Sequence, residues 1–277
     1  MRIEAGQVMA VTGGGSGIGR ALALGCAARG MAVAIADIEI GTAQETARLA
    51  EAHGVATLVR EVDVSRGDAM RAFADSVYDR FARCDLLCNN AGVLVLGPLG
   101  DARASDWRWA MDVNLMGLVH GIEAFVPRMR AARAGHVLNT VSLRGIVTSA
   151  GCGVYAASKF AALAVSETLR IELAADRIGV TALCPWSVDT AILASDRNRP
   201  GEGGGLSAEA VQRLIDAAPA NDLTIGADVV AAVAIEAVEA DEAYAITHPR
   251  ARALIEDRFH AIVRSIERVA ARHPELP

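Results

Sequence analysis

The stretch VMAVTGGGSGIG, residues 8–19, decides which fold the rest of the sequence has to fit. Its first five residues form an apolar run typical of a buried strand, and a glycine-rich turn and a stretch of helical period follow directly. Glycine permits backbone angles closed to other residues, and the free N–H groups of a helix N-terminus favour an anion. The stretch therefore predicts a strand, loop and helix that together cradle a phosphate.

The glycines of this loop have a defined spacing. They form the pattern T-G-x-x-x-G-x-G from Thr12 to Gly19, whereas the strict G-x-G-x-x-G spacing fails because the frame that starts at Gly15 ends on Arg20. A glycine-rich turn alone is weak evidence, but its place between a first strand and a first helix indicates a dinucleotide site. The loop residues expected to contact the cofactor are Gly13, Gly15, Ser16, Gly17, Ile18 and Gly19.

Short apolar runs and longer amphipathic stretches alternate along the chain. This alternation predicts an α/β fold with a parallel sheet covered by helices on both faces, and right-handed crossovers make it doubly wound. We expect one domain over residues 1–277, a Rossmann fold with a seven-stranded sheet. The strands are expected at 8–12, 32–36, 56–62, 85–88, 136–141, 178–184 and 243–247, and the helices at 17–29, 41–53, 67–82, 104–133, 155–176 and 226–240.

Two segments depart from the alternation. Residues 190–225 contain DRNRPGEGGG, which is too polar and glycine-rich for a core, so we expect a substrate lid with a short helix at about 207–217. A disordered excursion is the alternative. Residues 249–277 are expected to form a C-terminal helical extension, since Leu254, Ile255, Phe259, Ile262, Val263 and Ile266 follow helical spacing.

Composition narrows the partners. The formal net charge of −6 argues against nucleic acid, whose phosphates require a basic face. No apolar run reaches about 18 residues, and the N-terminus MRIEAGQVMAV lacks the apolar stretch of a signal peptide, so a cytoplasmic protein without a membrane span is expected. The five cysteines have no metal-ligand spacing; they are expected to be reduced thiols, and no metal site is predicted.

An acidic residue closes the second predicted strand. Asp37 lies 18 residues beyond Gly19, where a carboxylate accepts hydrogen bonds from both adenosine ribose hydroxyls and repels a 2′-phosphate. A site for NADP would need a nearby base, but the loop position 16 and the position after the acid hold Ser16 and Ile38. We therefore expect NAD rather than NADP. After the third strand, Asp63 and Val64 are expected at the adenine, and an ordinary turn is the alternative for Asp63.

The motif YAASK, Tyr155 to Lys159, carries the reactive group. Lys159 is the only lysine in a chain with 26 arginines, and it lies four residues after one of three tyrosines. Positions i and i+4 share one face of a helix. An ammonium about 4 Å from a phenol at an effective dielectric of about 20 interacts by roughly 4 kcal/mol, which predicts a phenol pKa lowered by about 3 units and a general base. Chance placement of the lysine is the alternative.

With these motifs the chain resembles the short-chain dehydrogenase/reductase family over nearly its whole length. The motif NNAG at 89–92, Asn114 in DVNLMG and Ser142 in VSLRG complete the match. The resemblance implies that Ser142 hydrogen-bonds the reacting oxygen and that Tyr155 moves the proton. It implies further that Lys159 holds the nicotinamide ribose and lowers the tyrosine pKa, while Asn114 fixes a water that links the lysine to solvent.

The resemblance also implies further cofactor contacts. The loop PWSVDT after the sixth predicted strand carries Trp186 where the family usually has glycine, which puts the geometry of the loop in doubt. Val188 and Thr190 still match. The contacts implied outside the glycine loop and the YAASK motif come from Asn90, Ala91, Gly92, Pro185, Val188 and Thr190.

The expected substrate pocket is mostly apolar, which favours a hydrophobic, aromatic or alicyclic secondary alcohol and its ketone, interconverted with NAD. The alternatives are an NADPH-dependent carbonyl or 3-ketoacyl-thioester reductase and a non-catalytic dinucleotide-binding regulatory protein. Long apolar stretches around 104–133 and 155–176 favour a homo-oligomer, a tetramer or a dimer. Arg144 is the one charge predicted in the pocket, either to meet a substrate carboxylate or phenolate or to face solvent or a subunit. The pocket residues are Leu94, Leu96, Arg144, Cys152, Trp186 and Leu193.

Overall fold

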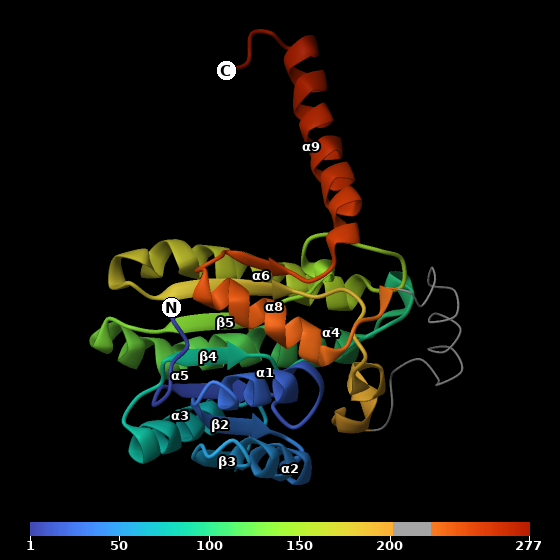
Figure 1. Cartoon of the computed structure of the whole chain (residues 1–277). Helices are drawn as coiled ribbons and strands as arrows, with labels where there is room; N and C mark the ends of the chain where they lie inside the picture. The colour runs from blue at the N-terminus through green and yellow to red at the C-terminus, as the bar shows by residue number, and fades with distance from the viewer. Residues whose placement is uncertain (202–222) are drawn as a thin grey trace.

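The computed structural model of the chain describes residues 1–201 and 223–277. Within them, seven parallel strands form one sheet in the order β3-β2-β1-β4-β5-β6-β7 (Figure 1). The predicted doubly wound α/β fold is therefore confirmed. The strands are β1 (Val8–Thr12), β2 (Ala32–Asp37), β3 (Thr57–Glu61), β4 (Leu86–Asn89), β5 (His136–Thr140), β6 (Gly179–Cys184) and β7 (Tyr244–Ile246).

Helices cover both faces of the sheet. Successive residues of a strand face opposite sides, so Met9 and Val11 of β1 join one apolar core while Val8 and Ala10 join the other. The first core also holds residues of α1 (Gly17–Ala27), α2 (Ile40–Glu51) and α8 (Ala227–Glu239), and the second holds residues of α3 (Gly67–Phe81), α5 (Gly117–Ala132) and α6 (Gly153–Leu173).

The prediction of a single helix over 104–133 is wrong, because this stretch is not one continuous α-helix. It is divided into α4 (Ala104–Met111), a π-helical turn η2 (Asp112–Met116) and α5. At the end of that turn Gly117 lies so close to the loop after β3 that a Cβ there would be 2.7 Å from Val64 Cγ2. The wider turn thus coincides with a tight approach to Val64, a contact that helical periodicity in the sequence does not indicate.

The two ends of the predicted lid lie side by side. Val188 pairs with Ile225 in a parallel bridge, and the chain then forms the 3-10 helix η5 (Ala191–Asn198). The Ser195 hydroxyl accepts a hydrogen bond from Leu94 N at 3.0 Å, which ties η5 to the loop after β4. The short helix expected at 207–217 lies outside the described residues.

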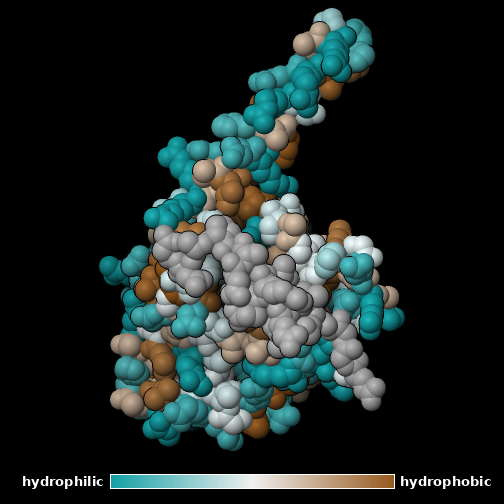
Figure 2. Space-filling view, turned by 90° about the vertical axis from the view of Figure 1, so that its right-hand side faces the viewer, coloured by the Kyte–Doolittle hydropathy of each residue, from teal (hydrophilic) through white to brown (hydrophobic). Residues whose placement is uncertain are grey.

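The C-terminal extension is the helix α9 (Arg252–Arg272), which projects away from the body of the protein (Figure 1). Its apolar side chains stay exposed, with Ile266 at 65% and Phe259 at 50%. Figure 2 shows hydrophobic surface gathered where this helix leaves the body. Among the described residues, no helix combines the length and apolarity needed to cross a bilayer.

Candidate active site

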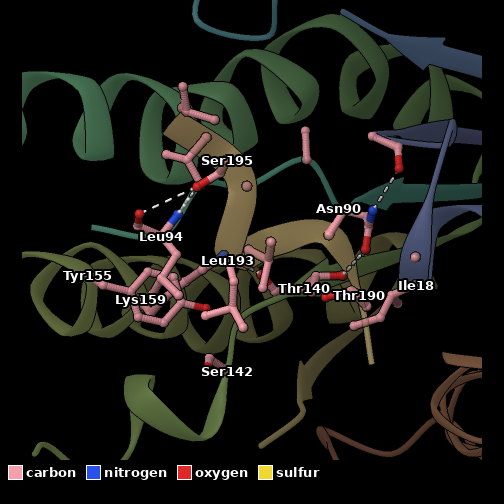
Figure 3. A pocket seen from close by; sticks show the side chains of 18 of the residues that line it. Ile18, Asn90, Leu94, Thr140, Ser142, Tyr155, Lys159, Thr190, Leu193 and Ser195 are labelled. Carbon is pink, nitrogen blue, oxygen red and sulfur yellow. Dashed lines mark hydrogen bonds between the residues drawn. The ribbon is translucent and has the colours of Figure 1, made fainter. Parts of the chain in front are cut away.

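A cavity of about 820 Å³ lies at the carboxyl edge of the sheet, where the loops after β1, β2, β4, β5 and β6 meet. The glycine loop lines one end of it and the YAASK motif lines the other. Figure 3 shows Ser142, Tyr155 and Lys159 on one side, with Ile18, Asn90 and Thr190 across from them. Most of the predicted site residues therefore share one cavity.

Tyr155 and Lys159 project from the first turns of α6 into this cavity. Both side chains are buried, with exposed fractions of 7% for the tyrosine and 3% for the lysine. Lys159 Nζ lies 5.8 Å from the centroid of the Tyr155 ring and donates a hydrogen bond to Thr140 O at 2.9 Å. The amine is thus fixed to the end of β5, one helical turn from the phenol.

The electrostatics of this pair differ from the prediction. Burial raises the pKa of the Tyr155 phenol to about 12, although the Ser142 hydroxyl and the Arg144 guanidinium act in the opposite direction. Burial also lowers the pKa of Lys159 to about 8. The expected lowering of the phenol pKa is therefore wrong, because desolvation of a buried phenolate outweighs the charges around it. At neutral pH the phenol keeps its proton.

Ser142 follows β5 and opens the short turn η3 (Leu143–Gly145). Its Oγ accepts a hydrogen bond from Arg144 N at 3.1 Å and lies 3.4 Å from Pro185 O, to which it donates. Gly145 lets the turn close on α6, since a Cβ there would be 2.7 Å from Lys159 O. The Ser142 hydroxyl is thereby held at the end of the cavity where the Tyr155 phenol lies.

Asn114 lies in the π-helical turn, behind the cavity wall. Its Oδ1 accepts from Val93 N at 2.8 Å, and its Nδ2 donates to Val93 O at 2.9 Å and to Ser158 Oγ at 3.0 Å. Ser158 in turn donates to Tyr155 O. The side chain of Asn114 is therefore engaged with Val93 and Ser158.

The glycine loop is closely packed against the end of β4. Gly13 has a φ of +64°, and a Cβ there would lie 2.8 Å from Ala91 Cα; at Gly19 it would lie 2.1 Å from Gly13 O. Asn90 Nδ2 donates to Thr12 O and Gly13 O, and Thr140 Oγ1 donates to Asn90 Oδ1. The NNAG motif therefore fixes the loop, as a phosphate cradle requires.

Asp37 is held by backbone amides at the glycine-loop end of the cavity. Its carboxylate accepts from Gly15 N at 2.7 Å and from Glu39 N at 2.9 Å. Arg197 of η5 reaches across and donates to Glu39 Oε1 at 2.6 Å. Arg197, a base from far along the chain, thus lines the same cavity as Asp37, but it is paired with Glu39. Ile38, Asp63 and Val64 line the same end.

His248 supports the loop that carries Trp186. Its Nδ1 accepts from Trp186 N at 3.3 Å, and its Nε2 lies 2.9 Å from Leu223 O and 3.1 Å from Ser187 O. Two carbonyl acceptors at Nε2 require the hydrogen on that nitrogen. The loop after β6 is thus anchored by one buried imidazole from the segment that follows β7. The centroid of the Trp186 ring lies 6.1 Å from that of the His248 ring, and Trp186 also lines the cavity.

Sequence reasoning placed most of the site but missed several of its supports. Gly15, Gly19 and Asn114 lie behind the wall, whereas the other predicted cofactor, catalytic and pocket residues line the cavity. The position of Thr140 at the end of a strand beside Ser142 was a usable signal. The contacts of Arg197 and His248 join residues 158 and 62 positions apart, which no local pattern indicates. The supports missed are Thr140, Ser158, Ser195, Arg197 and His248.

Comparison with known proteins agrees with this geometry. Residues 7–201 match the profile of the family described as short chain dehydrogenase, and the chain belongs to this family of oxidoreductases. It is 30% identical over 268 residues to a CLA biosynthesis dehydrogenase/reductase of Lactiplantibacillus plantarum, covering 93% of each chain. It is 34% identical over 263 residues to a 1-deoxy-11-beta-hydroxypentalenate dehydrogenase of Streptomyces arenae, covering 92% of this chain and 87% of the relative.

A solved structure extends the likeness to the fold. A short chain dehydrogenase/reductase of Burkholderia phymatum in complex with NAD is 34% identical, with a TM-score of 0.89, over 96% of this chain and 97% of the other. The family and this neighbour support a nicotinamide dinucleotide as the cofactor of the present chain.

Proposed function

We propose that the protein interconverts a hydrophobic secondary alcohol and its ketone, with NAD rather than NADP as the partner in hydride transfer. One observation carries the proposal: a single cavity joins a phosphate-cradling loop and an acid-ended strand to Ser142, Tyr155 and Lys159. Class membership makes the chain an oxidoreductase. The substrate class and the choice of dinucleotide are inferred from the side chains.

The residues present fit a dinucleotide. The backbone of the glycine loop would hold the diphosphate, Asp37 the adenosine ribose, and Asp63 with Ile38 the adenine. Lys159 would meet the nicotinamide ribose, while the chain from Val188 to Thr190 would meet the nicotinamide carboxamide. When bound, the cofactor accepts or supplies the hydride. Asp37 favours NAD, because it is a fixed carboxylate and Arg197, which lines the same cavity, is already paired with Glu39.

In the reductive direction, Ser142 donates a hydrogen bond to the carbonyl oxygen and Tyr155 gives that oxygen its phenol proton. A phenol pKa of about 12 keeps the proton on Tyr155 until the carbonyl oxygen gains negative charge. In the oxidative direction Tyr155 first loses its own proton to solvent and then accepts the alcohol proton as a phenolate. Ser142, Arg144 and the ammonium of Lys159 favour that phenolate. Asn114 positions this set by holding Val93 and Ser158.

The walls around the reacting end favour an apolar substrate. Leu94, Leu96 and Trp186 line it from the body, and Leu193 lines it from η5 (Figure 3 labels Leu94 and Leu193). We propose that the described residues 191–201 cover the bound substrate, since Ser195 fixes them to the loop after β4. The relative of Streptomyces arenae is named for a hydroxylated organic acid, which agrees with oxidation of a hydroxyl group.

We also propose that the protein is cytoplasmic and that it is a homo-oligomer. Exposed apolar side chains of α9, such as Ile266 and Phe259, support the assembly, because an isolated subunit would leave them in water. Light scattering after gel filtration tests the assembly, and a monomeric mass would refute it.

The test of the function is a screen of hydrophobic secondary alcohols with NAD⁺ and of the matching ketones with NADH, followed by absorbance of NADH. Wild type should turn over members of the panel, and the preference for NAD should persist when NADP is supplied at equal concentration. A preference for NADPH would favour a carbonyl or ketoacyl-thioester reductase. Binding of NADH without turnover of any member would favour a regulatory protein instead.

A further inference from the structure

Arg144 lies in the wall of the reaction cavity, and no other described side chain pairs with its guanidinium. It is half-buried and lines the cavity, and its backbone N–H donates to Ser142 Oγ at 3.1 Å. Within residues 1–201 and 223–277 its guanidinium has no hydrogen bond and no ion pair. Two other arginines near the cavity do have carboxylate partners: the exposed Arg197 pairs with Glu39, and Arg199, whose side chain is buried, pairs with Asp106.

The charged groups that share the cavity do not compensate Arg144. Asp37 and Asp63 belong to the adenosine end, where backbone amides and Ser65 already occupy them. Lys159 carries the same sign as Arg144 and donates to Thr140 O. The guanidinium therefore lacks a counterion on every described side of the reacting end.

The surroundings of Arg144 increase the demand for an anion. The lining of the same cavity is largely apolar and includes Leu94, Leu96, Cys152, Trp186 and Leu193. A charge next to apolar groups is costly unless it is paired and hydrogen-bonded. Guanidinium is also the cation best matched to a carboxylate, because its planar fork donates two parallel hydrogen bonds.

We propose that Arg144 binds the carboxylate of the substrate, so that the enzyme acts on hydrophobic hydroxy and oxo carboxylic acids. This inference rests on the proposed oxidoreductase function and narrows its substrate class. The carboxylate sits beside Arg144, the apolar body of the substrate lies along the leucines, and the reacting carbon lies at Ser142 and Tyr155. Because Arg144 is two residues from Ser142, binding of the acid group and placement of the reacting oxygen are controlled by one short turn, η3.

A competing role for Arg144 is purely electrostatic. The guanidinium draws down the pKa of the Tyr155 phenol, so its removal slows every substrate whether or not that substrate is charged. An anchor for a carboxylate, in contrast, discriminates between an acid and its neutral ester. The ratio of kcat/KM for an acid to that for its methyl ester separates the two roles, because a general effect on Tyr155 cancels in it.

The experiment uses straight-chain oxo carboxylic acids of several lengths, each beside its methyl ester, with NADH. Wild type should favour the best acid over its ester by about 10- to 100-fold, the range expected for hydrogen bonds to a charged group. Arg144→Met should bring the ratio to about one. Arg144→Lys should leave an intermediate ratio, because it keeps the charge but loses the fork. Arg264→Met, on the exposed face of α9, serves as the matched control and should retain the wild-type ratio.

A binding measurement provides a second readout. Saturated straight-chain carboxylates, which cannot react, should compete with the oxo acids in wild type and lose at least tenfold in affinity by calorimetry in Arg144→Met, while NADH binding and the circular dichroism spectrum stay unchanged. An acid preference that survives in Arg144→Met overturns the proposal. Turnover of neutral ketones without any acid preference overturns it while leaving the proposed function intact. Absence of turnover with all compounds overturns both.

Discussion

Burial of Lys159 should lower the free energy of unfolding at neutral pH, and this loss should disappear at alkaline pH. The pKa of Lys159 falls from 10.5 to about 8 on folding, which at 1.36 kcal/mol per pKa unit corresponds to about 3 kcal/mol of unfavourable burial of the ammonium. Lys159→Met removes that cost. It also strips Thr140 O of its donor, which costs about 1–2 kcal/mol. The variant should therefore be more stable than wild type by about 1–2 kcal/mol at neutral pH.

The sign of this difference should change with pH. Below about pH 8 the amine is charged in both the folded and the unfolded protein, so the whole cost is present. Between about 8 and 10.5 the folded amine is neutral while the unfolded chain still binds a proton, and the cost disappears by about 1.36 kcal/mol per pH unit. Near pH 10.5 only the lost hydrogen bond remains, and wild type should become the more stable protein.

Urea unfolding of both proteins across this range measures the effect. Buried thiols such as Cys26, whose pKa burial raises to about 12, make both proteins less stable above about pH 9, since only the unfolded chain then loses those protons. They are common to wild type and variant, so they cancel in the difference. Arg264→Met, which removes an exposed cation, should show no such crossing. A constant difference between Lys159→Met and wild type over the whole range would refute the reasoning.

Three further outcomes are expected. Tyr155→Phe should lower kcat for ketone reduction by about 10²- to 10⁴-fold with an unchanged NADH affinity, as followed by NADH absorbance and fluorescence titration, and a loss below tenfold would contradict its role as proton donor. Asp37→Ala should raise KM for NAD⁺ and shift the NADP-to-NAD preference by about tenfold or more in steady-state kinetics, whereas an unchanged ratio would contradict its selection against the 2′-phosphate. His248→Ala should destabilise the fold by about 2–3 kcal/mol in urea unfolding and raise KM for NADH, because the loop carrying Trp186 loses its anchor; a loss of stability with normal KM would mean that His248 does not position the loop.

The sheet and the two ends of the site were predictable because their signals are local. Strand and helix periods repeat within windows of a few residues, and the glycine loop declares itself by lying between the first strand and the first helix. The spacing from Tyr155 to Lys159 fixes a shared helical face without any knowledge of the tertiary structure. Each of these features depends only on residues close together in the sequence. The predictions made from them therefore agree with the structure.

The features that sequence reasoning missed depend on burial or on distant neighbours. The charge of Lys159 alone predicts a lowered pKa for the Tyr155 phenol. The side chain is only 7% exposed, however, and its desolvation raises that pKa. The π-helical turn at Asn114 ends where Gly117 closely approaches Val64, a residue far away in the sequence. His248 reaches its loop only because β7 lies beside β6.

The structure gives a physical reason why position 159 holds lysine in a chain whose other basic Lys/Arg positions are all arginine. A line of hydrogen bonds joins the two ends of the cavity: Asn90 Nδ2 donates to Gly13 O, Thr140 Oγ1 donates to Asn90 Oδ1, and Lys159 Nζ donates to Thr140 O. The last donor has to reach a backbone carbonyl at the end of β5 from a buried position one turn from Tyr155. A compact ammonium on a flexible stem can do this and can also lose its charge when it is desolvated, whereas a guanidinium stays charged and needs acceptors for five N–H groups. Since burial already brings the pKa of Lys159 to about 8, arginine at this position would place a permanent, under-bonded charge in the core at the reacting end of the cavity.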